Sequence, residues 1–315
     1  MLMLGYLLSM SGKRYNTFSA ELRRVFGCRV QRISVDAGFT CPNRDGTVAM
    51  GGCIFCGGNG SGAKGIIRGV SVTEQLAHGK AIMVSRFRAQ KFLAYFQAFS
   101  NTYGPVEHLR RLYDEALAVS DVAGLVIGTR PDCLPEDVIE LLAEYSRKTY
   151  FWLELGLQSS VDRTLAAVNR GHDTTCFIDA VRRCRERDIA VCAHLIFGLP
   201  GETREETLAT ATLLNELGVG GVKLHHLHVM QGTRLEELYL QGEIELMARD
   251  AYIGLVCDFL ERLDPGILVM RLLGDGGLNL VAPRWGSDKF DLLNAIDKEL
   301  GRRGTVQGSR SERVA

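Results

Sequence analysis

The regular alternation of short apolar runs with amphipathic helical patterns constrains the fold of this 315-residue chain more than any other feature. Such units join parallel strands, because parallel neighbours need a long crossover connection. The sequence therefore predicts an α/β fold with a parallel sheet. Periodicity leaves open whether that sheet is doubly wound or forms an incomplete barrel. The expected strands are 30–35, 91–99, 124–128, 150–157, 190–197, 222–230 and 267–273, and the helices between them are 135–148, 174–188 and 203–217.

The two ends of the chain are expected to lie outside one large domain. The stretch Met1–Met10 is apolar but too short to span a bilayer, and no basic residue lies ahead of it. We therefore predict that residues 1–13 form a disordered leader, with a signal peptide as the alternative. Residues 14–290 contain no internal repeat or low-complexity linker and are predicted to form one core domain. Residues 291–315 are predicted to complete a helix that starts at Lys289 and to end in a polar, disordered tail, Arg303–Ala315.

Charge and cysteine content limit the possible partners. The chain has 37 basic and 37 acidic residues, so no overall field attracts it to nucleic acid or membrane, and such a partner would need a local patch. The nine cysteines are odd in number and unevenly spaced, which favours a reducing compartment over disulfides. We therefore expect a cytoplasmic protein with no membrane partner.

A glycine- and cysteine-rich loop from Gly38 to Gly65 follows the first expected strand. It contains Cys41, Cys53 and Cys56 in the spacing C-x11-C-x2-C. The loop has few apolar residues and cannot form its own core, so something else must order it, and we predict a bound metal centre. Three thiolates on an iron–sulfur cubane leave the fourth iron open to chelate a substrate's amino and carboxylate groups.

A zinc site is the alternative interpretation of these thiols. Structural zinc takes four closed ligands, and Cys28 would have to supply the fourth. In that case the chain would be a noncatalytic, zinc-stabilised RNA-binding protein. The remaining cysteines are interpreted as small buried hydrophobes without a metal role, namely Cys133, Cys176, Cys184, Cys192 and Cys257.

Further motifs follow the cysteine loop in a fixed order. They are Asn101-Thr-Tyr-Gly-Pro105, Gly128-Thr-Arg-Pro-Asp132, Glu154-Leu-Gly-Leu-Gln158-Ser, Asn169-Arg-Gly-His172 and His194-Leu-Ile-Phe-Gly-Leu-Pro-Gly-Glu202. Over about residues 14 to 290 this order resembles the radical S-adenosylmethionine (SAM) superfamily, and more narrowly the YhcC/YtqA group, which is related to Elongator-type and coproporphyrinogen-dehydrogenase-type domains. The resemblance implies a partial (β/α)6 TIM-type barrel with short N- and C-terminal extensions and the cluster at its carboxyl-end mouth.

The resemblance also implies a reaction and its cofactors. Cys41, Cys53 and Cys56 would hold a [4Fe-4S] cluster, and a one-electron reductant such as flavodoxin or ferredoxin would supply the electron that cleaves SAM. The resulting 5′-deoxyadenosyl radical would take a hydrogen atom from the substrate. Members of the group are linked to tRNA wobble-uridine modification, the conversion of carboxymethylaminomethyl-uridine to aminomethyl-uridine. A small metabolite or another macromolecule is the alternative substrate.

Individual SAM contacts are implied by motif position. Gln158 matches a residue near the SAM ribose, and Arg170 matches one that holds the methionyl carboxylate, a task suited to a guanidinium fork. His194 stands where relatives often carry a ribose-binding aspartate. Asn101 begins the triplet that stands where many members carry Gly-Gly-Glu, which bonds the SAM amino group. The full expected set is Asn101, Thr129, Arg130, Glu154, Gln158, Arg170 and His194.

Two groups of polar residues each have two alternative roles. On an unbroken strand 222–230, Lys223 and His225 would share one face while His226 and His228 share the other, which argues against a single three-histidine metal site. One face would contact substrate, or the histidines would be core residues. Cations near the cysteine loop would bind RNA phosphates or simply be solvated, and they are Arg14, Arg23, Arg24, Arg29, Arg32, Arg44, Lys64 and Arg68.

Overall fold

The protein is described by a computed structural model covering residues 12–58, 60, 66–277, 279–286 and 288–311. Most of the predicted leader, residues 1–11, lies outside the described residues, as does Lys64.

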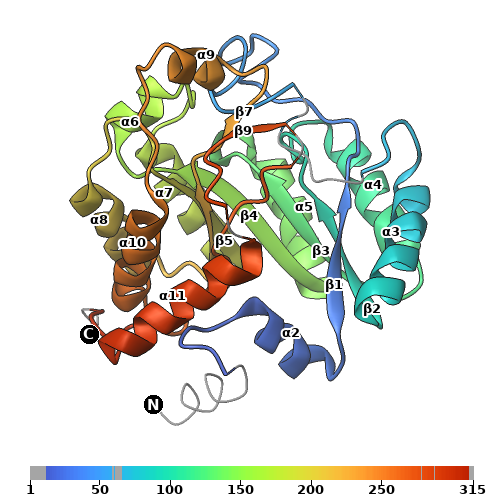
Figure 1. The fold of residues 1–315 in the computed structure, drawn as a ribbon. Helices are drawn as coiled ribbons and strands as arrows, with labels where there is room; N and C mark the ends of the chain where they lie inside the picture. The colour runs from blue at the N-terminus through green and yellow to red at the C-terminus, as the bar shows by residue number, and fades with distance from the viewer. Residues whose placement is uncertain (1–11, 59, 61–65, 278, 287, 312–315) are drawn as a thin grey trace.

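Seven parallel strands form one curled sheet in the order β1-β2-β3-β4-β5-β6-β8 (Figure 1). Neighbouring strands in this order run parallel and are joined by backbone hydrogen bonds. This arrangement confirms the predicted partial TIM-type barrel, which β8 extends by one strand. The strands are β1 Val30–Val35, β2 Lys91–Phe96, β3 Val122–Thr129, β4 Tyr150–Gln158, β5 Val191–Phe197, β6 Gly221–His226 and β8 Leu268–Arg271.

Helices connect the strands and cover the outer face of the sheet (Figure 1). Side chains satisfy the free N–H groups at several helix starts, and α3, α8 and α11 each carry a reciprocal capping box, as with Ser71 and Glu74. The helices are α2 Phe18–Phe26, α3 Val72–Phe87, α4 Val106–Ala118, the short η1 Pro131–Cys133, α5 Glu136–Lys148, α6 Asp162–Ala167, α7 Thr174–Arg185, α8 Arg204–Leu217, α9 Arg234–Leu240, α10 Arg249–Arg262 and α11 Lys289–Arg303.

Alternating side chains of the strands face two different environments. On β4, Phe151, Leu153 and Leu155 pack against the helices in the main hydrophobic core. Trp152 points to the other side, into a second core inside the barrel, where Phe18 and Leu22 of α2 also lie. Helix α2 therefore closes the amino end of the barrel, and the carboxyl ends of the strands are left to form the mouth.

One predicted strand is wrong: the run 222–230 forms two strands rather than one. β6 ends at His226, and the Leu227 N–H donates to the carbonyl oxygen of Phe197 (2.9 Å). The next strand, β7 Val229–Met230, leaves the barrel and pairs antiparallel with β9 Leu280–Ala282. The apolar residues continue across this break, so the sequence pattern gave no sign of it.

The predicted disorder of the tail is also wrong for the part that the structure describes. Gln307 is buried, with 2% of its surface exposed. Its Nε2 donates to the carbonyl oxygens of Asp264 and Ile267, both at 2.8 Å, and its Oε1 accepts from the Asn16 N–H at 2.8 Å. The tail thus joins the N-terminal segment to the turn before β8. Local composition could not predict these contacts, because the residues are far apart in the sequence.

We expect Gln307→Ala to lower the free energy of unfolding by about 1–3 kcal/mol, because buried backbone groups would lose their partners. Urea unfolding followed by circular dichroism measures this. Arg302→Ala is the matched control, since Arg302 is exposed and pairs with Glu299 on its own helix, and it should change stability by less than about 0.5 kcal/mol. A Gln307→Ala protein as stable as the control would show that the tail contributes nothing to the fold.

Candidate functional site

The cysteine loop lies at the carboxyl end of β1 and is held by a second segment, Val168–Gly171. The Asn43 side-chain amide donates to the carbonyl oxygen of Asn169 (2.6 Å), and the Asn169 side-chain amide donates to that of Gly52 (2.8 Å). The Ile54 N–H donates to the carbonyl oxygen of Val168 (3.1 Å). These bonds to the protein help to order the loop, beside the bound metal centre that the sequence predicts.

The loop and this segment approach so closely that Gly171 has no room for a side chain. A Cβ there would lie 2.2 Å from Asn43 Oδ1, and its φ of +76° is a left-handed conformation that suits glycine. The Asn169-Arg-Gly-His172 motif therefore reflects this contact as well as any cofactor role.

Nitrogen donors surround the sulfurs of the predicted cluster ligands. Asn43 Nδ2 and Arg170 Nη1 each lie 3.6 Å from Cys53 Sγ, and Arg44 Nη1 lies 3.6 Å from Cys56 Sγ. Such N–H···S contacts stabilise thiolates and tune the potential of a cluster that they hold. The donor set thus fits an iron–sulfur cluster with cysteine ligands.

The position of Cys28 argues against the zinc alternative. Cys28 precedes β1 and packs against the core that closes the amino end of the barrel, beside Phe18 and Leu22. Cys41 follows the opposite end of β1, and six strand residues span about 20 Å. Cys28 therefore lies too far away to complete a site with the loop thiols.

Glu154, a predicted SAM contact, has its carboxylate fully engaged by the protein. Its Oε1 accepts from Arg32 at 3.1 Å, and its Oε2 accepts from Lys223 Nζ at 2.6 Å and from the Tyr95 hydroxyl at 2.5 Å. Burial alone would raise the pKa of Glu154, but attraction to Lys223 and Arg32 outweighs it and holds that pKa well below its usual range. The structure thus gives Glu154 a place in a buried ion cluster inside the barrel.

Thr129 and Arg130 are likewise satisfied by protein groups. The hydroxyls of Thr129 and Thr102 bond at 2.6 Å. The Arg130 guanidinium makes two bonds to the Asp132 carboxylate, at 2.8 and 2.6 Å, and donates to the carbonyl oxygen of Arg170 at 2.8 Å. Arg130 therefore fixes the backbone of the segment that holds the cysteine loop.

The other four predicted SAM contacts each present a buried polar atom that has no hydrogen-bond partner among the residues that the structure describes. They are Asn101 Oδ1, Gln158 Oε1, Arg170 Nε and His194 Nε2. Buried polar atoms are rarely left unpaired in native proteins, so the unpaired atoms of these four residues fit a bound polar ligand. Two acceptors and a guanidinium N–H suit the amino, ribose and carboxylate groups of SAM.

The backbone at Gln158 is unusual in a way that accompanies functional sites. Its φ is +74°, which is uncommon for a residue other than glycine, and the β4–β5 register shifts between Gly156 and Gln158. Gly156 leaves space for both neighbours, because a Cβ there would lie 2.6 Å from Arg170 Nη2 and from Gln158 Nε2. The glycine of the Glu154-x-Gly156-x-Gln158 motif thus lets Arg170 and Gln158 lie side by side.

The structure corrects the predicted separation of the histidines. His225, His226 and His228 come together, and each contributes a ring nitrogen within 4.8 Å of the others. The strict alternation that we assumed fails because β6 ends at His226 and the chain turns at Leu227. Burial is the largest cause of a pKa lowered to about 3 for His226 and to about 4 for His228, so both rings are neutral at neutral pH.

The predicted basic cluster is also separated in space. Arg14, Arg23, Arg24 and Arg29 precede β1 and lie at the amino end of the barrel, opposite the cysteine loop. Arg32 points into the barrel as part of the ion cluster. Of the remaining members in the described part of the chain, Arg44 bonds the Cys56 and Gly57 carbonyl oxygens, and Arg68 pairs with Asp36. The basic residues are close in the sequence but not in space, because β1 lies between those that precede it and those on the cysteine loop.

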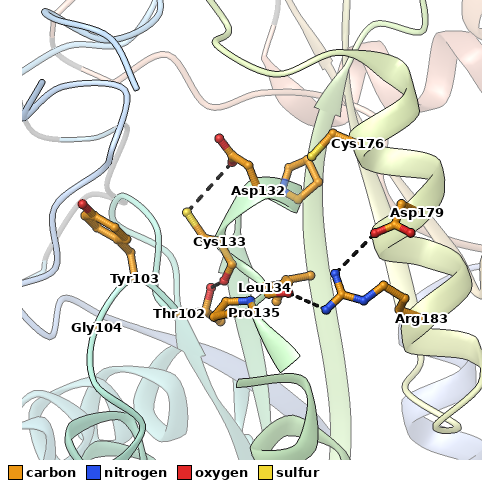
Figure 2. Close-up of a pocket in the computed structure, with 11 residues that line it drawn as sticks. Thr102, Tyr103, Gly104, Asp132, Cys133, Leu134, Pro135, Cys176, Asp179 and Arg183 are labelled. Carbon is orange, nitrogen blue, oxygen red and sulfur yellow. Dashed lines mark hydrogen bonds and ion pairs between the residues drawn. The ribbon is translucent and has the colours of Figure 1, made fainter. Parts of the chain in front are cut away.

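A hollow of about 550 Å³ opens beside the site, between the loop after β2, η1 and the start of α7 (Figure 2). Its lining includes Tyr103, Asp132, Cys133 and Cys176, and Figure 2 shows Arg183 joined to Asp179 at one side. None of the cluster cysteines or the four unpaired SAM-contact candidates lines it. We therefore place the candidate site at the barrel mouth and treat this hollow as a neighbouring surface feature.

Comparison with known proteins agrees with this geometry. The radical SAM superfamily model matches residues 41–214, and the radical SAM C-terminal domain model matches residues 219–302. The chain belongs to the radical SAM superfamily. It is 44% identical to YtqA of Bacillus subtilis over 97% of this chain and 95% of YtqA, which confirms the narrower resemblance. The protein is accordingly a radical SAM enzyme, and the family implies a [4Fe-4S] cluster and SAM.

Two more distant relatives extend the comparison. A tRNA uridine(34) acetyltransferase of Dehalococcoides mccartyi is 29% identical over 51% of this chain and 36% of its own length. The solved structure of Elp3 from Methanocaldococcus infernus matches with a TM-score of 0.68 at 17% identity, over 88% of this chain and 64% of the Elp3 chain. This structural likeness shows a shared fold.

In the described part of the chain, no helix has the length and apolar character needed to cross a membrane.

We expect Glu154→Gln to cost about 3–5 kcal/mol in the free energy of unfolding, because it leaves Lys223 and Arg32 without their buried anion. Equilibrium unfolding in urea measures the loss. The same change at Glu144, whose partner Arg110 is on the surface, should cost less than about 1 kcal/mol. If folded Glu154→Gln protein instead kept full stability but lost SAM affinity, Glu154 would be a cofactor contact after all.

Proposed function

We propose that Cys41, Cys53 and Cys56 hold the [4Fe-4S] cluster, and that Asn101, Gln158, Arg170 and His194 bind SAM beside it. When bound, the cluster and SAM supply a 5′-deoxyadenosyl radical for hydrogen-atom abstraction. The single observation that carries this proposal is the position of Arg170, which donates to Cys53 Sγ and to the Gly156 carbonyl oxygen and still has an unpaired Nε.

The roles of the residues follow from their contacts. Arg170 is held by two bonds, so its guanidinium presents the unpaired Nε–H in a fixed direction toward an anionic group such as a carboxylate. Asn101 is fixed by its side-chain amide, which donates to the Gly128 carbonyl oxygen (2.8 Å), and its Oδ1 is left to accept from an ammonium group. Thr129, Arg130 and Glu154 act as positioning residues that hold these groups in place.

Alanine at Cys41, Cys53 or Cys56 should remove the cluster and with it SAM cleavage. Anaerobically reconstituted protein should contain about four irons and release 5′-deoxyadenosine with reductant, and each variant should fall to background in both measurements. Cys257→Ala is the control, because Cys257 is buried between α10 and α11, away from the mouth, and should keep the cluster. A Cys53→Ala variant with full cleavage would remove Cys53 from the ligand set.

We further propose that the substrate is a tRNA wobble uridine, whose carboxymethylaminomethyl group is converted to an aminomethyl group. Likeness to a tRNA uridine(34) acetyltransferase supports an RNA substrate. Hydrogen abstraction from the carbon between the carboxylate and the amine, with loss of one further electron to the oxidised cluster, would give an imine, and water would hydrolyse this imine to glyoxylate and the aminomethyl product. A flavodoxin- or ferredoxin-type reductant would supply the electron. The basic residues named above lend this proposal little support, since half of them lie at the other end of the barrel.

Incubation of carboxymethylaminomethyl-modified tRNA with protein, SAM and dithionite should convert the wobble nucleoside to its aminomethyl form. Mass spectrometry of the digested nucleosides detects the lost carboxymethyl group, and the Cys53→Ala variant provides the blank. If 5′-deoxyadenosine forms but every tRNA nucleoside keeps its mass, and tRNA from a deletion strain is also unchanged, a small metabolite or another macromolecule becomes the favoured substrate.

A further inference from the structure

Three histidines gather where β6 ends, outside the cysteine loop and its contacts. The Nε2 atoms of His226 and His228 lie 2.6 Å apart, and the His225 ring lies 4.4 Å from that of His228, between ring centroids. Among the described residues, they are the one group of three or more histidine, cysteine or acidic side chains whose potential ligand atoms all lie within 4.8 Å of one another. We propose that His225, His226 and His228 bind one divalent transition-metal ion of the zinc class.

The tautomer of His225 suits a metal ligand. Its Nδ1 lies 2.5 Å from the carbonyl oxygen of His226, and a carbonyl oxygen can only accept, so Nδ1 carries the hydrogen. The neutral ring then keeps its lone pair on Nε2. A backbone carbonyl that fixes one ring nitrogen in this way is the usual outer partner of a metal-binding histidine.

The contact between His226 and His228 does not give every ring nitrogen a hydrogen-bond partner. One proton between the two Nε2 atoms makes a single N–H···N bond, and it leaves the buried Nδ1 of His226 without a partner in the described part of the chain. His226 and His228 are only 8% and 7% exposed, so water does not readily make up the deficit. A cation replaces that shared proton. Because zinc–nitrogen bonds are about 2.0–2.1 Å long, binding requires the two atoms to separate to about 3.3 Å in a tetrahedral site.

The surroundings hold these rings in place. His226 stacks on Trp285 with 4.4 Å between ring centroids and also contacts the Tyr252 ring at 5.3 Å. The backbone at Gly274 lies against His225, since a Cβ there would be 2.1 Å from its Nε2. Arg271, the nearby cation, is paired with Asp275 (3.6 Å), which offsets its repulsion of a bound metal ion.

Ligand chemistry selects the metal class. Three imidazoles suit zinc and the related ions cobalt, nickel and copper, whereas magnesium and calcium prefer oxygen ligands. Three protein ligands also leave a fourth position open, as in zinc sites that bind a water or substrate. The proposed ion is zinc, and its fourth coordination position is available to an oxygen or nitrogen donor of the substrate.

The test is zinc content measured beside iron content on the full-length, cluster-loaded protein. Wild-type protein should hold about one zinc in addition to about four irons after dialysis, and His226→Ala/His228→Ala protein should lose zinc affinity by about 100-fold or more with its iron unchanged. His78→Ala, a change of an exposed histidine on α3, should bind zinc as the wild type does. Because iron reports the cluster separately, failure of this proposal is distinguishable from failure of the radical chemistry.

Two further measurements do not depend on the double variant folding. X-ray absorption at the zinc edge of wild-type protein should show nitrogen scatterers at about 2.0–2.1 Å with the pattern of imidazole rings, and no sulfur at about 2.3 Å. Gly274→Ala, which displaces the His225 ring without removing a ligand, should weaken zinc binding about 10- to 100-fold. Sulfur ligands, zinc retained by the double variant, or wild-type protein that binds no zinc would each overturn the proposal.

Discussion

The hydrogen bonds between the cysteine loop and residues 168–171 are the constraint on which the candidate site depends. The loop has few apolar side chains, so these polar contacts fix where its sulfurs lie together with the packing of Ile54 and Phe55 against a neighbouring apolar cluster. Arg170 is the central link, because its guanidinium donates to Cys53 Sγ and also to the Gly156 carbonyl oxygen on β4 (2.6 Å). The Arg170 side chain therefore connects Cys53, a predicted cluster ligand, to strand β4. A change in the position of Cys53 relative to β4 would break one of these two contacts.

The barrel interior is arranged in layers with different functions. Phe18, Leu22 and Trp152 fill the amino end with apolar side chains. Above them, Glu154 and Lys223 form a polar layer whose hydrogen bonds are made within the protein. The mouth differs, since its polar atoms include several without partners. A polar ligand at the mouth would therefore supply hydrogen bonds that the protein does not make there.

How much the sequence predicted depends on how local the controlling interactions are. Buried parallel strands appear as continuous apolar runs, so 150–157 came close to β4, and three thiols on one loop are recognisable without a structure. The partner of Glu154 is Lys223, 69 residues away, and no local pattern joins them. Gln307 was missed for the same reason, since its partners lie 40 to 291 residues away. The histidine cluster was missed because a single turn at Leu227 breaks the assumed strand.

The histidine cluster and the cysteine loop share one support. Ile54 and Phe55 of the loop pack against the apolar cluster that contains Leu227 and Val229, on either side of His228. The Leu235 N–H at the start of α9 donates to the Ile54 carbonyl oxygen (2.9 Å), so the chain that leaves the histidines returns to the loop. Figure 1 shows α9 and β7 at the same end of the molecule as this loop. Because an apolar cluster packs as a unit, a shift in the turn that carries His228 displaces Ile54 and so bears on the position of Cys53 and Cys56.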